Sequence, residues 1–207
     1  MGRKKKSSMK TIESDTSSRL GNSEEYCHKI EYAMKTLERT DSWINNCDSK
    51  VSILIGIWGV ALTIILATDS VKTAYTFIIE NLLKNIGVYK GIFIVFAFAI
   101  LGSYVNTLRH IIHTLLARID SKKYIQNDLR CNSNIFFGSI VQREYDQYKK
   151  SFINEKTEDR MNDVLSQIYI NSTIATTKYK NFNNSLIWSV ISAVSTLLIV
   201  IWAIVGF

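Results

Sequence analysis

The stretch TDSWINNCDSKVSILIGIWGVALTIILAT, residues 40–68, joins a polar helical sequence directly to an uncharged apolar one. The 18 residues from Val51 to Thr68 carry no charge. As a helix they measure about 27 Å, close to the ~30 Å hydrocarbon core of a bilayer. A buried helix of a soluble protein is the alternative, but such helices usually run shorter and keep a polar edge. The stretch therefore predicts a chain that crosses a membrane.

Two further uncharged runs have the length of a membrane span. They cover residues 91–108 and residues 185–207, which are 18 and 23 residues long. Proline is absent from the chain, and its absence favours long continuous helices because proline is the strongest helix breaker. The sequence thus predicts an all-α membrane protein with three transmembrane helices, at residues 51–68, 91–108 and 185–207.

The polar remainder of the chain predicts a helical cytosolic body. Residues 1–22 are basic and rich in Ser and Thr, which is typical of a disordered tail, and no signal-peptide core follows them. Residues 23–50 and 109–184 are expected to form the body, so that residues 23–207 make a single domain. An irregular segment is expected around residues 127–142, followed by a helix from about Glu158 that enters the last span unbroken. Residues 69–90 fit either an amphipathic helix in the outer interface or a packed connector.

The net charge of +7 is distributed unevenly along the chain. Ten Lys and Arg precede the first span, 3 lie between the first and second, and 12 lie between the second and third. The positive-inside rule therefore predicts a cytoplasmic N-terminus and a C-terminus outside. The basic residues suit anionic lipid headgroups, or more specifically a phosphate-bearing ligand. No nucleic-acid partner is expected, because the basic tail lacks interleaved aromatic residues.

The sequence gives no indication of catalysis or of a metal site. Cys27, Cys47 and Cys131 lack the spacing of a zinc site or a redox motif. His110 and His113 stand at i and i+3 on a helix but lack a third ligand nearby. We find no nucleophile elbow, P-loop or paired catalytic carboxylate, so neither an enzyme nor a cofactor is expected. The uncharged spans also argue against a pump or a transporter.

Small residues recur at four-residue spacing in each span. Small side chains let helices approach closely where lipid supplies no hydrophobic driving force. The pattern fits packing within one subunit or between subunits, and the sequence leaves both open. These residues are Ser52, Gly56, Ala99, Ser103, Ser185, Ser189 and Ala193.

An ordered set of short motifs resembles the small membrane effectors of the Pycsar antiphage system. The resemblance covers residues 25–206 and starts at WINNCDSKVSIL, residues 43–54. It continues through NIFFGSI, residues 134–140, and ends in QIYINSTIATTKY, residues 167–179. The motif positions are Trp43, Asn46, Asp48, Lys50, Asn134, Phe136, Phe137, Gly138, Glu144, Tyr145 and Lys178.

This resemblance implies an effector that a cyclic pyrimidine mononucleotide, cyclic CMP or cyclic UMP, activates after a partner cyclase makes it during phage infection. The active protein would impair the bacterial inner membrane and abort the infection, and we expect a homo-oligomer in the bilayer. Ligand contacts are expected at Lys50, Arg130 and Lys178, which are cations in or near the motifs, and at Phe137, which offers a stacking face. Lys50 also fits a snorkelling membrane anchor, and Phe137 a core residue.

A different class of function also fits the sequence. The chain is alternatively a membrane-anchored scaffold that recruits a cytosolic partner through residues 109–183 and never makes the bilayer leak. A neighbouring gene for a nucleotide cyclase would favour the effector over the scaffold.

Overall fold

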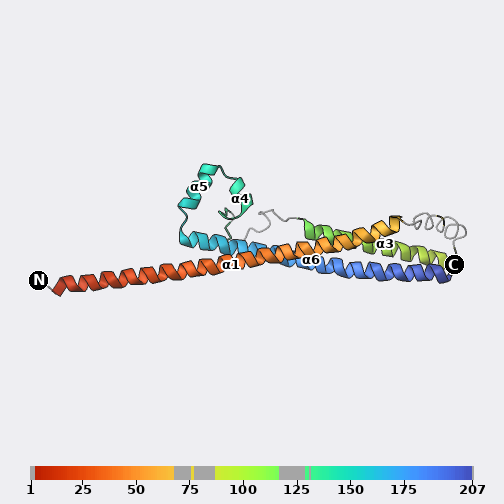
Figure 1. Ribbon diagram of the computed structural model, residues 1–207, viewed down its shortest axis with the longest axis horizontal. Helices are drawn as coiled ribbons and strands as arrows, with labels where there is room; N and C mark the ends of the chain where they lie inside the picture. Colours follow the sequence, from red (N-terminus) through yellow and green to blue (C-terminus); the bar gives the residue numbers. More distant parts are fainter. Residues whose placement is uncertain (1–2, 68–75, 77–86, 117–128, 131, 207) are drawn as a thin grey trace. The chain divides into compact units, whose positions relative to one another are not determined.

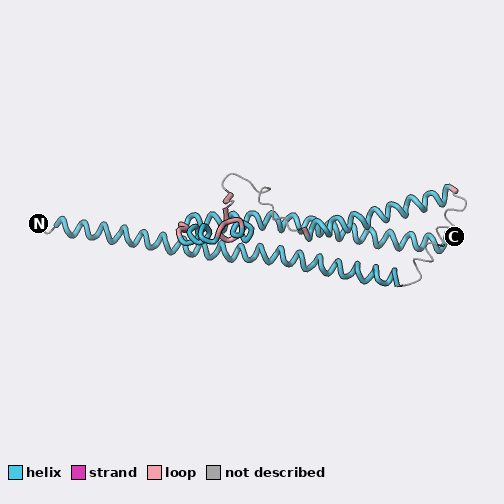
Figure 2. The backbone as a smooth tube through the Cα atoms, turned by 90° about the horizontal axis from the view of Figure 1, so that it is seen from above, coloured by secondary structure: helices cyan, strands magenta, loops and turns pink. Residues whose placement is uncertain are grey.

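The computed structural model describes residues 3–67, 76, 87–116, 129–130 and 132–206, and over these residues it is helical without a strand (Figure 1, Figure 2). Three helices are long and apolar enough to cross a membrane. They are α1 (Arg3–Ala67), α3 (Val88–Leu115) and α6 (Thr157–Gly206). The described parts of the three predicted spans fall on these helices, which confirms the all-α class and the three spans.

Helix α1 is continuous over 65 residues and carries the junction of residues 40–68 without a break. It begins at Arg3, so the structure has helix where the sequence analysis expects a disordered tail over residues 1–22. Beyond Gly2 this segment contains one glycine, Gly21, and no proline. Nothing in it therefore stops a helix that the apolar part of α1 has already nucleated.

The chain divides into two compact units, and the single domain expected over residues 23–207 stays a prediction. Met1–Ser42 and Arg118–Thr173 form the first, called the polar unit below, and Trp43–Ala117 and Ile174–Phe207 form the second, called the span unit. Helices α1 and α6 each contribute residues to both units. The division follows the polarity of the sequence, because all three predicted spans belong to the span unit.

The polar unit contains two short helices, α4 (Phe137–Val141) and α5 (Tyr145–Ile153), in addition to parts of α1 and α6. The predicted irregular segment is confirmed where it is described, since residues 129–130 and 132–136 precede α4 without helix. Helix α6 begins at Thr157 with Glu158 and Asp159 in its first turn, where acidic side chains stabilise a helix. The amphipathic segment predicted for residues 69–90 lies almost entirely outside the described residues.

The span unit is packed around a small apolar cluster formed by Cys47, Val51, Leu54, Ile111 and Phe182. Only 17%, 22% and 17% of the most apolar windows of the three spans are buried. Most of their side chains therefore face outward, where a soluble protein would expose polar groups.

The small residues of the spans divide between two directions. Ser103, Ser185 and Ser189 are buried inside the span unit. The other four are exposed, and a Cβ atom added at Gly56 would meet no atom within 4 Å. Packing within one subunit thus accounts for part of the pattern and leaves a second set facing outward: Ser52, Gly56, Ala99 and Ala193.

Candidate functional site

The motif segment of residues 134–138 begins at a turn that Ser133 holds. The Ser133 side chain is fully buried, and its Oγ accepts the backbone N–H groups of Ile135 at 3.0 Å and of Phe136 at 2.9 Å. These donors precede α4 and have no helical partner, so a hydroxyl at this position satisfies them. The chain therefore passes from extended backbone at Phe136 into α4 at Phe137.

Asn134 is the centre of the polar network in this unit. Its backbone N–H donates to Asp163 Oδ2 at 2.7 Å, and its Nδ2 donates to Glu155 Oε1 at 2.8 Å. Its Oδ1 accepts from Arg143 Nη1 at 2.8 Å and from Ser151 Oγ at 3.1 Å. Asn134 is 2% exposed. One buried amide thus connects the motif segment to α5 and α6 and to the residues that flank these helices.

Two arginines belong to the network around Asn134. Arg143 donates to the carbonyl oxygens of Ser133 and Ser139, at 2.5 and 3.1 Å. Arg130 Nη1 lies 3.1 Å from Glu155 Oε1 and donates to the Asp159 carbonyl at 2.6 Å. Together with Glu155 and Asp163, the two guanidinium groups make a locally balanced set of two positive and two negative charges. A phosphate reaching Arg130 would have to share that guanidinium with Glu155.

Asp163 is the least satisfied member of this network. Its side chain is fully buried, and Oδ1 has no hydrogen-bond partner among the described residues. A buried carboxylate oxygen without a donor costs free energy, so such atoms call for an explanation. Asp163 Oδ1 is therefore a buried acceptor that still lacks a donor among the described residues.

Phe136 and Phe137 give the motif an aromatic surface. Their ring centroids lie 4.8 Å apart, and Phe137 is 62% exposed, so it is a surface residue and not a core residue. A Cβ atom at Gly138 would lie 2.6 Å from Cε1 of Phe136, so the glycine makes room for that ring. The exposed Phe137 ring is the kind of face on which a nucleobase stacks.

The other two predicted contacts, Lys50 and Lys178, belong to the span unit. The Lys178 ammonium is buried, 8% exposed, and donates to both Asp48 carboxylate oxygens at 2.5 and 2.7 Å. The Lys50 ammonium lies over the Tyr179 ring, 5.5 Å from its centroid, which is a cation–π distance. The structure thus brings Lys50 and Lys178 to neighbouring positions beside Asp48 and Tyr179. Arg130 and Phe137 belong to the polar unit instead: Arg130 precedes the motif segment, and Phe137 lies within it.

Cys47, which directly precedes Asp48 in the sequence, has a thiol of low expected reactivity. Burial raises the pKa of the Cys47 thiol, which lies outside the predicted span and is 0% exposed. A raised pKa leaves less of the reactive thiolate at neutral pH. Cys27, in contrast, is exposed. Among the residues that the structure describes, no group of three or more His, Cys, Asp or Glu side chains is placed to hold a metal ion.

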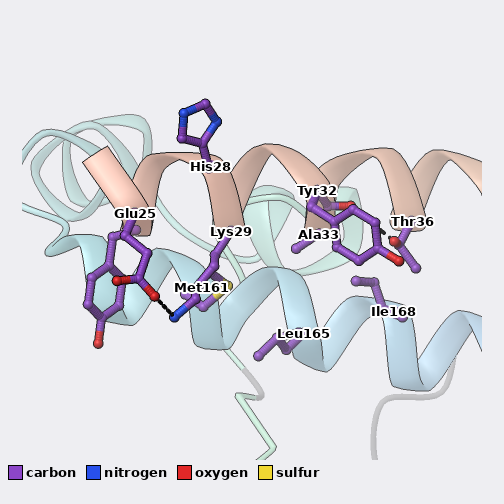
Figure 3. A pocket seen from close by; sticks show the side chains of 10 residues that line it. Glu25, His28, Lys29, Tyr32, Ala33, Thr36, Met161, Leu165 and Ile168 are labelled. Carbon is purple, nitrogen blue, oxygen red and sulfur yellow. Dashed lines mark hydrogen bonds and ion pairs between the residues drawn. The ribbon is translucent and has the colours of Figure 1, made fainter. Parts of the chain in front are cut away.

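A groove with a volume of about 660 Å³ lies between α1 and α6 within the polar unit. Figure 3 shows Met161, Leu165 and Ile168 of α6 facing α1 across it. Glu25 and Lys29 close one end with an ion pair of 2.6 Å (Figure 3). Their hydrogen bond lowers the pKa of the Glu25 carboxyl and raises the pKa of Lys29. The groove is apolar with a neutralised charged end, which suits an apolar partner better than a free phosphate.

Sequence reasoning missed four members of the network: Arg143, Ser151, Glu155 and Asp163. None lies in a motif that carries chemistry, and their contacts to Asn134 span 9 to 29 positions of sequence. Two indirect signals for these partners were available in the sequence. A buried asparagine in a motif requires several hydrogen-bond partners, and Arg143 directly precedes the Glu144-Tyr145 pair of the motif.

Comparison with known proteins covers both units. A family model described as the Pycsar effector protein domain matches residues 32–206. A curated relative, the Pycsar effector protein GmPycTM of Gulbenkiania mobilis, is 27% identical over 175 residues, which cover 79% of this chain and 87% of the relative. No solved structure matches the chain.

Proposed function

The chain belongs to the Pycsar effector protein family, as its motifs predict, and we propose that it is a membrane effector that a cyclic pyrimidine mononucleotide switches on. The observation that carries the proposal is the extent of the family match. Residues 32–206 include the Asn134 network and all three helices that can cross a membrane. The part that we propose to bind the ligand and the part that can cross the membrane thus belong to one family domain.

The proposed activator is cyclic CMP or cyclic UMP, supplied by a cyclase partner during phage infection. The proposed first contacts are Arg130 and Phe137, because Arg130 offers a guanidinium beside Glu155 of the Asn134 network and Phe137 offers an exposed aromatic ring in the motif segment. Phosphate binds guanidinium well, and a pyrimidine stacks on an aromatic face. The orphan oxygen of Asp163 gives further support, since a ligand or a water that it orders would supply the missing donor.

Lys50 and Lys178 remain proposed ligand contacts, but their surroundings differ. The charge of Lys178 is matched by Asp48, so a phosphate would have to displace a bidentate carboxylate. Lys50 is exposed and lies beside the Tyr179 ring, which also fits a headgroup-anchoring lysine. If Lys50 binds the ligand, cyclic nucleotide should protect its ammonium group from chemical modification. If Lys50 anchors to lipid headgroups, cyclic nucleotide should give no protection.

The proposed location is the bacterial inner membrane, with the N-terminus cytoplasmic and the C-terminus outside. This follows from the 10 and 12 basic residues that flank the spans on one side, against 3 on the other. The proposed action is non-enzymatic. Ligand binding would shift the spans between two arrangements, because α1 and α6 contribute residues to both units. The bilayer would then leak and the infection would abort.

The proposed assembly is a homo-oligomer within the bilayer. Ser52, Gly56, Ala99 and Ala193 face outward from the span unit. Small outward residues allow close helix contact with a second chain, which aliphatic side chains would prevent. No nucleic-acid partner is proposed.

Titration of the detergent-solubilised chain with cyclic CMP and cyclic UMP tests the ligand. Arg130→Gln should weaken binding by about 10- to 100-fold, as expected for loss of a charge-assisted hydrogen bond. Arg160→Gln, an exposed arginine of the same unit, is the matched control and should leave binding unchanged. Wild-type affinity after Arg130→Gln, Lys50→Gln and Phe137→Ala together would refute the assigned contacts.

Loss of membrane potential in expressing cells tests the action. We expect depolarisation only when a cyclic pyrimidine nucleotide is present, and depolarisation of equal size without nucleotide would refute gating.

The scaffold is the second candidate, and the groove of the polar unit is the observation that favours it. Its apolar wall of Met161, Leu165 and Ile168 is a surface onto which a partner helix could pack. A scaffold predicts a stable co-purifying protein and no leakage under any ligand. Leakage triggered by nucleotide would exclude it.

A further inference from the structure

The span unit sorts its side chains by polarity, as transmembrane bundles commonly do. Outward from α6 stand aliphatic residues such as Val190 and Leu197, each 62% exposed. Inward, between α3 and α6, stand hydroxyl groups. We call this inner line the hydroxyl seam and define it by six residues: Ser103, Tyr104, Thr107, Ser189, Ser192 and Thr196.

Two pairs of hydroxyls in the seam meet across the two helices. Ser103 Oγ and Ser192 Oγ lie 2.8 Å apart, and Tyr104 Oη and Thr196 Oγ1 also lie 2.8 Å apart. Ser192 is fully buried, and Ser103 is 5% exposed. All these residues fall within the predicted spans of residues 91–108 and 185–207. This part of the bundle is therefore polar but uncharged within the predicted spans.

Helix α1 covers the seam with one aromatic side chain. The Trp58 indole N–H donates to Ser189 Oγ at 3.1 Å, and the Trp58 ring meets the Tyr104 ring edge-on with centroids 5.3 Å apart. The indole is thus held over the seam by a hydrogen bond and a ring contact.

Both ends of the seam are closed by apolar groups. At one end the Trp202 ring packs against Phe93 and Phe96, with centroids 5.3 and 6.3 Å apart. At the other end lies the apolar cluster that includes Val51 and Phe182. A hydroxyl-lined middle between two apolar closures is dry while the bundle is closed.

Separation of α3 from α6 would change the hydration of the seam. Freed hydroxyls in hydrocarbon are costly, whereas water satisfies them, so an opened seam admits water in preference to lipid. One polar atom already lacks a partner on this side of α3: His110 Nδ1, seven positions beyond Ser103, is buried and unpaired among the described residues. Water entering from that end of the seam would satisfy it.

We propose that the hydroxyl seam is the path along which water and small ions cross the bilayer when the effector is active. The inference rests on the proposed function, which requires a leak but does not say where it occurs. Because the seam holds hydroxyls and no charge, the path would select weakly among small ions. Bilayer disruption at the outward aliphatic faces is the competing route.

Cysteine labelling distinguishes the two routes. In a chain carrying Cys27→Ser, Cys47→Ala and Cys131→Ser, Ser192→Cys places a thiol in the seam. Val190→Cys, two residues away on the same helix, places one on the outward face. The protein is reconstituted in vesicles of phosphatidylethanolamine and phosphatidylglycerol. A charged methanethiosulfonate reagent and potassium flux are then followed with and without cyclic CMP or cyclic UMP.

We expect nucleotide to start the flux and to speed labelling of Ser192→Cys at least ~10-fold, because a buried thiol becomes wet. Labelling should reduce the flux, and Val190→Cys should stay unlabelled. A nucleotide-triggered flux with Ser192→Cys unlabelled, or with both positions labelled equally, overturns the seam and leaves the proposed function standing.

If neither nucleotide starts a flux, the proposed function is refuted. A variant that leaks without ligand then still tests whether the seam is the path. Ser192→Asp puts a charge in the seam that draws in water, and Val190→Asp puts the same charge on the outward face. A constant leak through Ser192→Asp alone supports the seam. Equal leaks, or none from Ser192→Asp in a chain that inserts and elutes as wild type, overturn it.

Discussion

The polar unit and the span unit both bury polar side chains, but they use them for opposite purposes. In the polar unit, Ser133, Arg143 and Asp163 bond to backbone groups of an irregular segment that has no helical partner. In the span unit the backbone is already satisfied within long helices, and pairs such as Ser103 and Ser192 join one helix to another. Side-chain bonds therefore create the local structure in the first unit, whereas in the second they select which helix faces meet.

The two units also differ in charge. The Asn134 network contains two guanidinium and two carboxylate groups, whereas the predicted spans contain no charge. The ion pair of Asp48 with Lys178 belongs to the span unit but lies outside the predicted spans. Equivalent truncations should therefore cost more in the polar unit than among the spans.

The largest loss is expected at Asn134. Asn134→Ala removes the amide that joins Glu155, Arg143 and Ser151, and should lower the free energy of unfolding by about 3 kcal/mol. Thermal unfolding of the detergent-solubilised protein measures it. Asn132→Ala, an exposed amide two residues earlier, is the control and should change little. If Asn134→Ala lowers the free energy of unfolding no more than Asn132→Ala does, the predicted difference between the two units is wrong.

The second largest loss is expected at the ion pair. Asp48→Ala leaves the Lys178 ammonium buried and unpaired, at a cost of about 2 kcal/mol, less than for a fully buried pair because the Asp48 side chain is 37% exposed. The double variant Asp48→Leu with Lys178→Met should recover most of that stability in the same unfolding experiment. If the double variant is as unstable as the single one, packing and not charge explains the effect.

Two glycines should respond in opposite directions. Gly138→Ala forces the Phe136 ring to move and should cost about 1 kcal/mol. Gly102→Ala, in the interior of α3 with no atom within 4 Å, should gain about 0.5–1 kcal/mol through helix propensity. Unfolding of both variants gives the signs. A loss at Gly102 would instead indicate that another chain packs against this face of the span unit.

The smallest loss is expected within the seam. Ser103→Ala removes one hydroxyl pair between α3 and α6 and should cost about 0.6 kcal/mol, the average for interhelical bonds in membranes. Hydrogen exchange of α3 gives a second readout, because weaker contact with α6 speeds local opening. A loss as large as that of Asn134→Ala would show that the seam bonds create structure as those of the polar unit do.

The long helices and the spans could be predicted from the sequence because their signal is local. Uncharged runs of membrane length fix residues 51–68, 91–108 and 185–207, and acidic residues mark the start of α6 near Glu158. The helix over residues 3–22 could not be predicted, since Ser- and Lys-rich composition is compatible with both helix and coil. The division into two units could not be predicted either, because it falls inside the continuous helices α1 and α6, where the sequence pattern shows no break.

The candidate site was predicted only in part, for a physical reason. Motif residues such as Asn134, Phe137 and Lys178 stand out in the sequence, but their partners do not. Asp48 and Lys178 are 130 positions apart, and Asn134 and Asp163 are 29 apart, so periodicity carries no trace of either contact. The inward and outward serines of the spans likewise share the same spacing and separate only once the helices are packed.

Nucleotide-triggered depolarisation of vesicles is the most direct test of a ligand-gated membrane effector. The full-length wild-type chain is reconstituted in vesicles with a potassium gradient, and the membrane potential is followed as cyclic CMP, cyclic UMP or cyclic AMP is added. We predict rapid loss of the potential with one of the two pyrimidine nucleotides and none with cyclic AMP or without nucleotide. A potential that persists with both pyrimidine nucleotides, or that is lost equally without any, would contradict the proposed function.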